Sequence, residues 1–404
     1  MTQPIALPIL VLCLGHVFSN AVRTIPAIAA DVLIRDLGLT AETLAQVTGA
    51  FPLVFAIAMV PVGIGLDRHG VKAVSLCLLA VAGCGAAMGA AATGPWSMLA
   101  AQMVLGAGCS GMLMCPITFA ARGLSAARFA SWSGIIQAVG NTGMLLSASP
   151  LAWLIEATDW RMGYAACAAL ALSAMAAVAA FVPHDRPPPR PSRGIAADMG
   201  EVLSLAWSPG LRAVTVFVFA SFAAVLGVRG LWGGPWLMEV KGLPRVEAGN
   251  ILLAAALALT AGPAIGGYAL RRIGRPVLLL SGSHLLAAAL ILLLVAGGPG
   301  GAASRAFGLA VMPPGWDLLL LVAFGIVISF QIIAFSLVRA AVPAEQAGRA
   351  LSAANMYYFL GAAVLQGLSG WAAGQGGVAA ALLTFAGGLV LCTAGFLLLQ
   401  RGRG

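Results

Sequence analysis

Charged side chains are scarce in this chain of 404 residues. Asp, Glu, Lys and Arg make up 9% of it and apolar residues 61%, with a mean hydropathy of +0.99. Soluble domains contain about 25% charged residues, so the charges here are too few to cover a soluble globule. Disorder requires low hydrophobicity and high net charge, and is excluded as well. These shortages indicate a protein that is surrounded by lipid.

Signatures of enzymes and of cofactor sites are also missing. The sequence holds no Walker-type phosphate loop, no Gly-x-Ser-x-Gly elbow, no His-Glu-x-x-His helix and no paired intramembrane Asp. The seven Cys lie in apolar runs without a CxxC pair, and we interpret them as packed thiols. The 22 basic residues give a net charge of +9, but they are scattered in twos and threes, which does not favour nucleic-acid binding. We expect no enzymatic activity and no cofactor.

Long apolar runs are what the sequence has in abundance. A helix crosses the bilayer with about 20 apolar residues, and about twelve such runs occur. They do not alternate apolar and polar residues as barrel strands do, so the prediction is an all-α membrane protein with 12 transmembrane helices. The predicted spans are residues 6–34, 42–64, 72–93, 96–120, 130–155, 161–182, 208–238, 247–270, 276–297, 315–338, 350–371 and 377–400.

Basic residues are distributed unevenly among the loops. With the amino terminus inside, 15 Lys and Arg fall in inside loops or at their edges and 5 in outside loops. The positive-inside rule therefore places both termini in the cytoplasm, in a bacterial-type inner membrane. Residues 1–4 carry no Lys or Arg and the first apolar run is too long for a signal core, so we predict no cleaved signal.

A polar, proline-rich stretch from His184 to Arg193 separates the sixth and seventh spans. We interpret it as part of a cytoplasmic linker, residues 184–206, between two six-helix bundles, residues 1–183 and 207–404.

Two separate features of the first bundle recur in the second at one offset. Gly63, Arg68 and Gly70 match residues of the same type 204 positions later, and the turn 37–39 (Leu-Gly-Leu) matches 241–243 (Lys-Gly-Leu) at the same 204. The bundles are therefore parallel repeats, an architecture found in transporters that rock around a central site.

The loop after the second span carries a motif. Gly63-x-x-x-Asp67-Arg68-x-Gly70-x-Lys72 resembles the inner-loop signature of the major facilitator superfamily. The resemblance implies two bundles around a cavity lined by spans 1, 4, 7 and 10, a monomer, and a gating loop that stabilises the outward-open state. In that loop Asp67 would cap a neighbouring helix amino terminus, while Arg68 and Lys72 would pair with carboxylates or phospholipid. The alternative is a tight turn with positive-inside charges and no gating role.

Two departures from the family pattern argue against a proton-driven drug pump. Gln102 precedes Gly106 where the family often has an Arg linked to proton coupling, and the fifth span lacks the drug-exporter sequence Gly-Pro-x-x-Gly-Gly. No Asp or Glu lies near mid-span, where proton-coupled carriers usually hold one. Three options remain open: His16 carries a coupling proton, the substrate carries it, or the protein is an exchanger or facilitator.

Two arginines lie inside spans, where a charge costs several kcal/mol and indicates function. They are Arg23 in the first span and Arg229 in the seventh; the 204 offset maps Arg23 to Gly227, two residues short of Arg229. We expect both guanidinium groups to face one cavity and to bind a carboxylate or phosphate. The positions are similar to those of organophosphate and organic-anion members of the superfamily. Alternatively, either Arg reaches the outer interface or pairs with Asp31 or Glu239.

Polar and aromatic neighbours extend this candidate site. On the first span, spacing i, i+4, i+7 places three polar residues on one helix face, and the seventh span has a similar stripe of one Arg and two Trp. The two Trp are either substrate contacts or part of an aromatic belt, and two amides of the fifth span are either substrate contacts or interhelical hydrogen bonds. The predicted substrate-binding residues are Arg23, Arg229, His16, Asn20, Trp232, Trp236, Gln137 and Asn141.

The sequence thus predicts a secondary active or facilitated transporter that moves a small solute, with an organic or inorganic anion preferred, by alternating access. Efflux of drugs or amphipathic metabolites is the alternative. Uptake of a transition metal such as copper is less favoured, because the soft ligands of the fourth span, Cys109, Met112, Met114 and Cys115, do not share one face. The expected partners are the small-molecule substrate, the lipid bilayer and a proton as candidate coupling ion.

Overall fold

The computed structural model describes residues 5–124, 126–146, 148–185, 200, 204–342 and 347–401, which form helices and contain no strand. Ten of these helices are long and apolar enough to cross a membrane. The run Ala6–Val22 is shorter, and the longest, Ala353–Gln400, is interrupted at Gly376 and Gly377 and covers two predicted spans. Twelve spans were predicted, and the count of ten is lower because Ala6–Val22 is too short to be included and Ala353–Gln400 is counted once.

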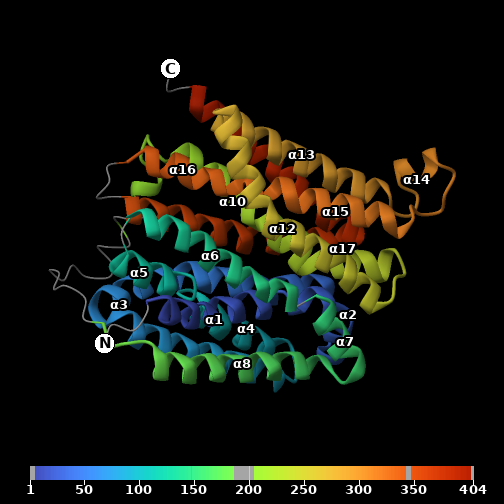
Figure 1. Ribbon diagram of the computed structural model, residues 1–404. Helices are drawn as coiled ribbons and strands as arrows, with labels where there is room; N and C mark the ends of the chain where they lie inside the picture. The colour runs from blue at the N-terminus through green and yellow to red at the C-terminus, as the bar shows by residue number, and fades with distance from the viewer. Residues whose placement is uncertain are drawn as a thin grey trace.

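The helices form two halves that lie side by side as an upper and a lower layer (Figure 1). The N-terminal half contains α1 (Ala6–Val22), α2 (Ile25–Leu37), α3 (Ala41–Ala90), α4 (Pro95–Cys109), α5 (Met114–Gly123), α6 (Ala126–Leu146), α7 (Ser149–Ala157) and α8 (Trp160–Phe181). The C-terminal half contains α10 (Arg212–Ala224), η1 (Val225–Trp232), α11 (Gly233–Pro235), η2 (Trp236–Val240), α12 (Arg245–Ile273), α13 (Pro276–Ala296), α14 (Ala302–Ala306), α15 (Pro314–Ile328), η3 (Ser329–Ile332), α16 (Ile333–Ala340) and α17 (Ala347–Arg401). Because α1 begins and α17 ends on the left of Figure 1, we call that end the terminal end and the other the opposite end.

Glycine lets the chain reverse direction within two of the longest helices. In α3, Gly70 has φ 81° and ψ 170°, and in α17, Gly377 has φ 67°. Residues with a Cβ rarely adopt a positive φ, whereas glycine does so readily. These two positions therefore divide α3 and α17 into the predicted second and third, and eleventh and twelfth, spans.

The first, fourth, seventh and tenth spans are each irregular near their middle. The first is interrupted between α1 and α2 and the fourth between α4 and α5, while the seventh is π-helical over η1 and η2 and the tenth contains the 3-10 turn η3. Within a membrane, non-helical backbone is tolerated where it is buried in protein or lines a cavity, and π turns are frequent at functional sites. The four symmetry-related spans are therefore where a site is expected.

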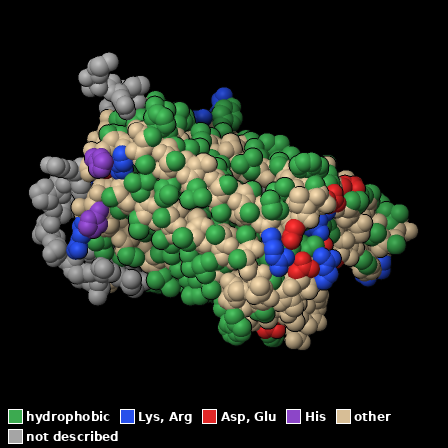
Figure 2. Space-filling view, turned by 90° about the horizontal axis from the view of Figure 1, so that it is seen from below, with side chains coloured by type: hydrophobic (Ala, Val, Ile, Leu, Met, Phe, Trp, Pro, Cys, Tyr) green, Lys and Arg blue, Asp and Glu red, His purple; other side chains and the backbone are tan. Residues whose placement is uncertain are grey.

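The outer surface of the N-terminal half has the pattern of a membrane protein. Figure 2 shows a broad middle zone of apolar and uncharged atoms, with charged side chains gathered near the two ends. Large apolar residues are exposed along the chain, including Trp96 and Leu172. Lipid tails offer no partner for a charge, so a middle zone of this kind suits contact with the bilayer.

Candidate functional site: a cavity between the two halves

A cavity of about 170 Å³ lies between the two halves. Residues from eight predicted spans line it, four from each half: spans 1, 2, 4 and 5, and spans 7, 8, 10 and 11. All four spans that the family resemblance implied contribute to it, and the other four are additions. Binding sites of small molecules are typically concave and mostly apolar with a few polar groups, so this cavity is the candidate site.

The wall from the N-terminal half is polar. The predicted binding residues of the first and fifth spans other than Arg23 all line the cavity: His16, Asn20, Gln137 and Asn141. Asn20 Nδ2 donates to the Gly140 carbonyl at 2.9 Å and lies 3.4 Å from His16 Nε2, while Gln137 Nε2 donates to Asn141 Oδ1 at 3.1 Å. The bond from Asn20 to Gly140 joins α1 to α6, while the other two contacts each lie within one helix.

The close approach of these two helices depends on a glycine. A Cβ on Gly140 would lie 1.6 Å from His16 Cδ2, so no larger residue fits there without displacing the imidazole. Small residues allow neighbouring membrane helices to approach closely. The Gly140 position therefore sets where His16 sits in the wall.

Arg23 is the one Lys, Arg, Asp or Glu in the described lining of the cavity. It lies at the break between α1 and α2, where its Nε donates to the Ser19 carbonyl at 3.0 Å and its Nη2 to Ser19 Oγ at 3.1 Å. Its Cζ is 5.8 Å from the ring centroid of Phe222 and 5.9 Å from that of Phe359, both in the C-terminal half. Among the described residues it has no carboxylate partner.

Arg229 lies outside the cavity lining and joins the two halves instead. Its Nη2 donates to the Met144 carbonyl of α6 at 2.7 Å, and its Nε to the Leu252 carbonyl of α12 at 3.4 Å. Trp232 and Trp236 are buried within the C-terminal half, where their Nε1 atoms donate to Ser369 Oγ and Asp317 Oδ1. The expected convergence of two guanidinium groups on one cavity is therefore not seen in this structure.

The helix geometry of the seventh span explains this difference. The predicted stripe of Arg229, Trp232 and Trp236 assumed 3.6 residues per turn, but η1 and η2 are π-helical. A π turn bonds i to i+5 and holds more residues than an α turn, so residues at a given spacing point in other directions than α geometry implies. Five of the eight predicted binding residues share the cavity and these three do not.

The predicted gating loop lies at the terminal end, on α3. Gly70 provides the reversal, and Lys72 Nζ donates to the Ala179 carbonyl of α8 at 2.8 Å. Gly63 and Arg68 also lie on this helix, while the side chain of Asp67 is outside what the structure describes, so its capping role stays a prediction.

Among the described residues, Asp185 caps a helix amino terminus in this loop. Its carboxylate accepts from the backbone N–H of Val71 at 2.8 Å and of Lys72 at 3.2 Å, and it pairs with Arg122 Nη1 at 3.0 Å. A carboxylate at this position accepts hydrogen bonds from N–H groups that have no partner within the helix. Its negative charge is also favoured by the helix dipole. In the sequence Asp185 falls within the predicted linker, where no local pattern indicates this contact.

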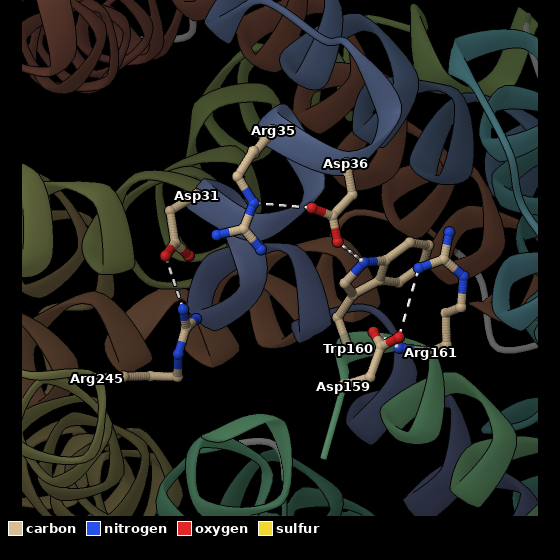
Figure 3. Close-up of polar contacts among 7 residues, drawn as sticks. All are labelled: Asp31, Arg35, Asp36, Asp159, Trp160, Arg161 and Arg245. Carbon is tan, nitrogen blue, oxygen red and sulfur yellow. Dashed lines mark hydrogen bonds and ion pairs between the residues drawn. The ribbon is translucent and has the colours of Figure 1, made fainter. Parts of the chain in front are cut away.

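The opposite end is closed by contacts between the halves. Arg245 of α12 pairs with Asp31 of α2 at 2.6 Å (Figure 3), and its Nη1 donates to the Ile28 carbonyl. Ser149 of α7 donates to Asn250 Oδ1 of α12 at 2.6 Å. Sequence analysis assigned no role to these pairs, because their partners are more than 100 residues apart.

The cavity lies on the terminal-end side of this closure. Phe335, in its lining, is five residues from the end of α16, and Asn355 is eight residues from the start of α17. At 1.5 Å per residue these positions are about 8 and 12 Å from the terminal ends of their helices. The cavity therefore lies between the closed opposite end and the terminal end.

Two similar helical halves around a central cavity define a polytopic membrane transporter of the alternating-access type. The sequence matches the Major Facilitator Superfamily over residues 12–366, so the chain belongs to that superfamily.

Solved structures agree on the fold. A POT family transporter in complex with 5-aminolevulinic acid has a TM-score of 0.81 at 12% identity, with 98% of this chain and 96% of that chain covered. The nucleoside transporter NupG has a TM-score of 0.75 at 15% identity, with 97% and 98% covered. At such identities the similarity concerns the fold alone. No curated protein matches the sequence.

Proposed function

We propose that this transporter carries a small organic anion across the inner membrane, with Arg23 binding the negative charge. The observation that carries the proposal is an Arg in the cavity wall without a carboxylate partner among the described residues. A guanidinium group stays charged when buried and binds carboxylates in bidentate geometry. The lining contains no described Asp or Glu that would select a cation instead.

The loop charges orient the molecule. The 15-to-5 excess of basic residues in the loops predicted to lie on the same side as both termini supports a cytoplasmic location of the termini. In that orientation the closed opposite end faces outward, and the cavity belongs to an inward-facing state. Arg229 and Arg245 then act in closure of the outer side, since each contacts the N-terminal half.

The charge of Arg23 gives substrate binding a role in the transport cycle. Enclosing an unpaired charge away from water is costly, and a bound counter-charge reduces that cost. The loaded carrier therefore closes around its site more easily than the empty one. We propose exchange or facilitated transport by a monomer; His16, beside Asn20 in the wall, is the candidate if a proton is coupled.

Two other cargoes remain as alternatives. Efflux of amphipathic compounds is supported by the apolar character of most of the lining, and copper by the presence of His16, Cys109, Met114 and Met144 in it. Among the described residues no group of three or more His, Cys, Asp or Glu side chains has the geometry of a metal site.

Ligand binding to the purified full-length protein tests the proposal. Thermal stabilisation would be measured with organic anions, phosphate, Cu(I) and an amphipathic cationic dye. A hydrogen bond to a charged group is worth about 1.5–3 kcal/mol, so Arg23→Gln should weaken anion binding roughly 10- to 100-fold. Arg305→Gln, on exposed α14, is the matched control. Unchanged anion binding by Arg23→Gln, or stabilisation by the dye or Cu(I) alone, would overturn it.

A further inference from the structure

Aromatic rings from both halves form a continuous series in the cavity lining, which we call the aromatic wall. Neighbouring rings lie 3.8 to 6.4 Å apart between centroids, close enough for each ring to contact the next. All five rings belong to the cavity lining. In order they are Phe55, Phe359, Phe222, Tyr358 and Phe335.

The single positive charge of the cavity lies against this aromatic wall. Phe222 and Phe359, whose ring centroids are both within 6 Å of Arg23 Cζ, stand in the middle of the series, 4.9 Å from each other. A ligand that pairs with the guanidinium group is therefore held next to ring faces. The polar amides of Gln137 and Asn141 lie in the same cavity on the N-terminal half.

The charged side chains of the described lining favour a ligand with one negative group and no positive group. Arg229 is committed to backbone carbonyls outside the lining, so a second guanidinium group does not face a dianion such as phosphate. The described lining also contains no carboxylate that would bind the ammonium group of a zwitterion. A desolvated ammonium group without a partner would be strongly unfavourable.

From these observations we propose that the cargo is a planar aromatic monocarboxylate, whose carboxylate pairs with Arg23 while its ring stacks on the wall formed by Phe222 and Phe359. The inference rests on the proposed anion transport and specifies the body of the anion. Phe222 and Phe359 belong to the C-terminal half and Arg23 to the N-terminal half. One ligand would therefore contact both halves at once. Such a ligand draws the halves together when it binds.

The ligand body is tested by comparing two acids of equal charge. Benzoate and cyclohexanecarboxylate bury similar apolar area, but only benzoate has a π face. Aromatic pairs contribute about 0.5–1.5 kcal/mol beyond area burial, so the purified full-length protein should bind benzoate roughly 2- to 10-fold more tightly. Benzamide, which keeps the ring and lacks the charge, should bind at least about 10-fold more weakly than benzoate. Affinities would be measured by titration calorimetry at neutral pH.

Substitutions in the aromatic wall test whether it causes the preference for benzoate over cyclohexanecarboxylate. Phe222→Leu and Phe359→Leu keep an apolar side chain and should bring the affinity ratio of benzoate to cyclohexanecarboxylate close to one. Phe324→Leu, at a buried position outside the cavity lining, should leave the ratio unchanged. The ratio in the unmodified protein is independent of whether a variant folds.

The outcomes separate this inference from the proposed function. If the unmodified protein binds cyclohexanecarboxylate or acetate as tightly as benzoate, and Arg23→Gln abolishes both, the aromatic cargo is wrong and anion transport stands. If benzamide binds as tightly as benzoate and Arg23→Gln changes nothing, both are wrong. If the Leu variants keep the full benzoate preference, the ring is recognised elsewhere and the inference is overturned.

Discussion

Arg245 and Asp31 join the two halves at the opposite end, with Nη2 2.6 Å from Oδ2. The Arg245 side chain is 12% exposed and that of Asp31 40% exposed, so solvent screens the pair. A partly exposed ion pair contributes about 1 kcal/mol or less. The contact has to break each time this end opens, and a weak pair suits a contact that forms and breaks in every cycle.

Removing this pair should shift the protein toward opening of the opposite end. Asp31→Asn or Arg245→Gln should raise the accessibility of this end up to about fivefold, as a loss of about 1 kcal/mol implies. Labelling rates of a Cys introduced at Asn250 measure the change. The exchanged pair Asp31→Arg with Arg245→Asp should restore the original rate, and equal rates in all variants would contradict the role in closure.

A larger side chain at Gly249 should hold the opposite end open. A Cβ there would lie 2.9 Å from Ala152 Cβ and 3.3 Å from the Ser149 Cα, so Gly249→Leu cannot fit without separating α12 from α7. Overpacking typically costs about 1–3 kcal/mol. We expect transport to fall and labelling from the side of the opposite end to rise. Gly282→Leu, where a Cβ meets nothing within 4 Å, is the control; a Gly249 variant with normal transport would count against this.

Asp185 should stabilise the terminal end more than a surface acid does. Asp185→Ala removes the acceptor for the Val71 and Lys72 N–H groups and the partner of Arg122. Loss of a helix cap costs about 0.5–2 kcal/mol, which should appear as a lower Tm and faster labelling at the terminal end. Glu156→Ala, at an exposed position of α7, is the comparison. If Asp67→Ala has the larger effect, capping belongs to Asp67 as the family resemblance implied.

The buried pair of Lys241 and Asp317 should be the most sensitive ion pair of the C-terminal half. Nζ lies 2.9 Å from Oδ2 with both side chains at most 2% exposed, and Nζ also donates to the Gly297 and Met312 carbonyls. Asp317→Asn leaves a buried ammonium group unpaired, at a cost of about 3–5 kcal/mol. The double variant Lys241→Met with Asp317→Asn removes the unpaired charge, keeps an acceptor for Trp236 Nε1 and should recover much of the lost Tm. A single variant as stable as the original would contradict this reasoning.

Acid should weaken the network around Asp36 at the opposite end (Figure 3). Partial burial acts to raise the pKa of Asp36, but hydrogen bonds from Arg35 and Trp160 and the charges of Arg35 and Arg161 outweigh it and lower the pKa. A lowered folded pKa gives stability that is complete above the ordinary Asp pKa and is lost as the pH falls through the lower folded value. Tm measured against pH should show a smaller acid-induced loss in Asp36→Asn than in the unmodified protein. Identical profiles would disprove the contribution.

The spans and the repeat could be predicted because the signals for both are local. Run length fixes a span, and Gly70 marks the reversal in α3 by its positive φ. The orientation of Arg229 could not be predicted in this way, since η1 departs from α geometry. The only local sign was the concentration of glycine around it, with Gly227 and Gly230 two and one residues away.

Contacts between different spans could not be predicted from the sequence for another reason. Arg23, Phe222 and Phe359 come from three spans, and no spacing within one helix reveals which spans meet. The five predicted cavity residues all belong to two spans of one half, where helix periodicity applies. The aromatic wall, which requires the relative placement of both halves, was therefore not predicted.

The interruptions of the first, fourth, seventh and tenth spans have a mechanical consequence. An unbroken helix turns as one rod, so a movement at one tip is transmitted to the other. Breaks after Val22, Cys109 and Ile328, together with the π turns of η1, allow the two arms of each span to move separately. The arms toward the terminal end can then bend over a bound molecule while the arms toward the opposite end keep their seal. This architecture is therefore compatible with an occluded intermediate, in which the terminal end closes before the contacts at the opposite end break.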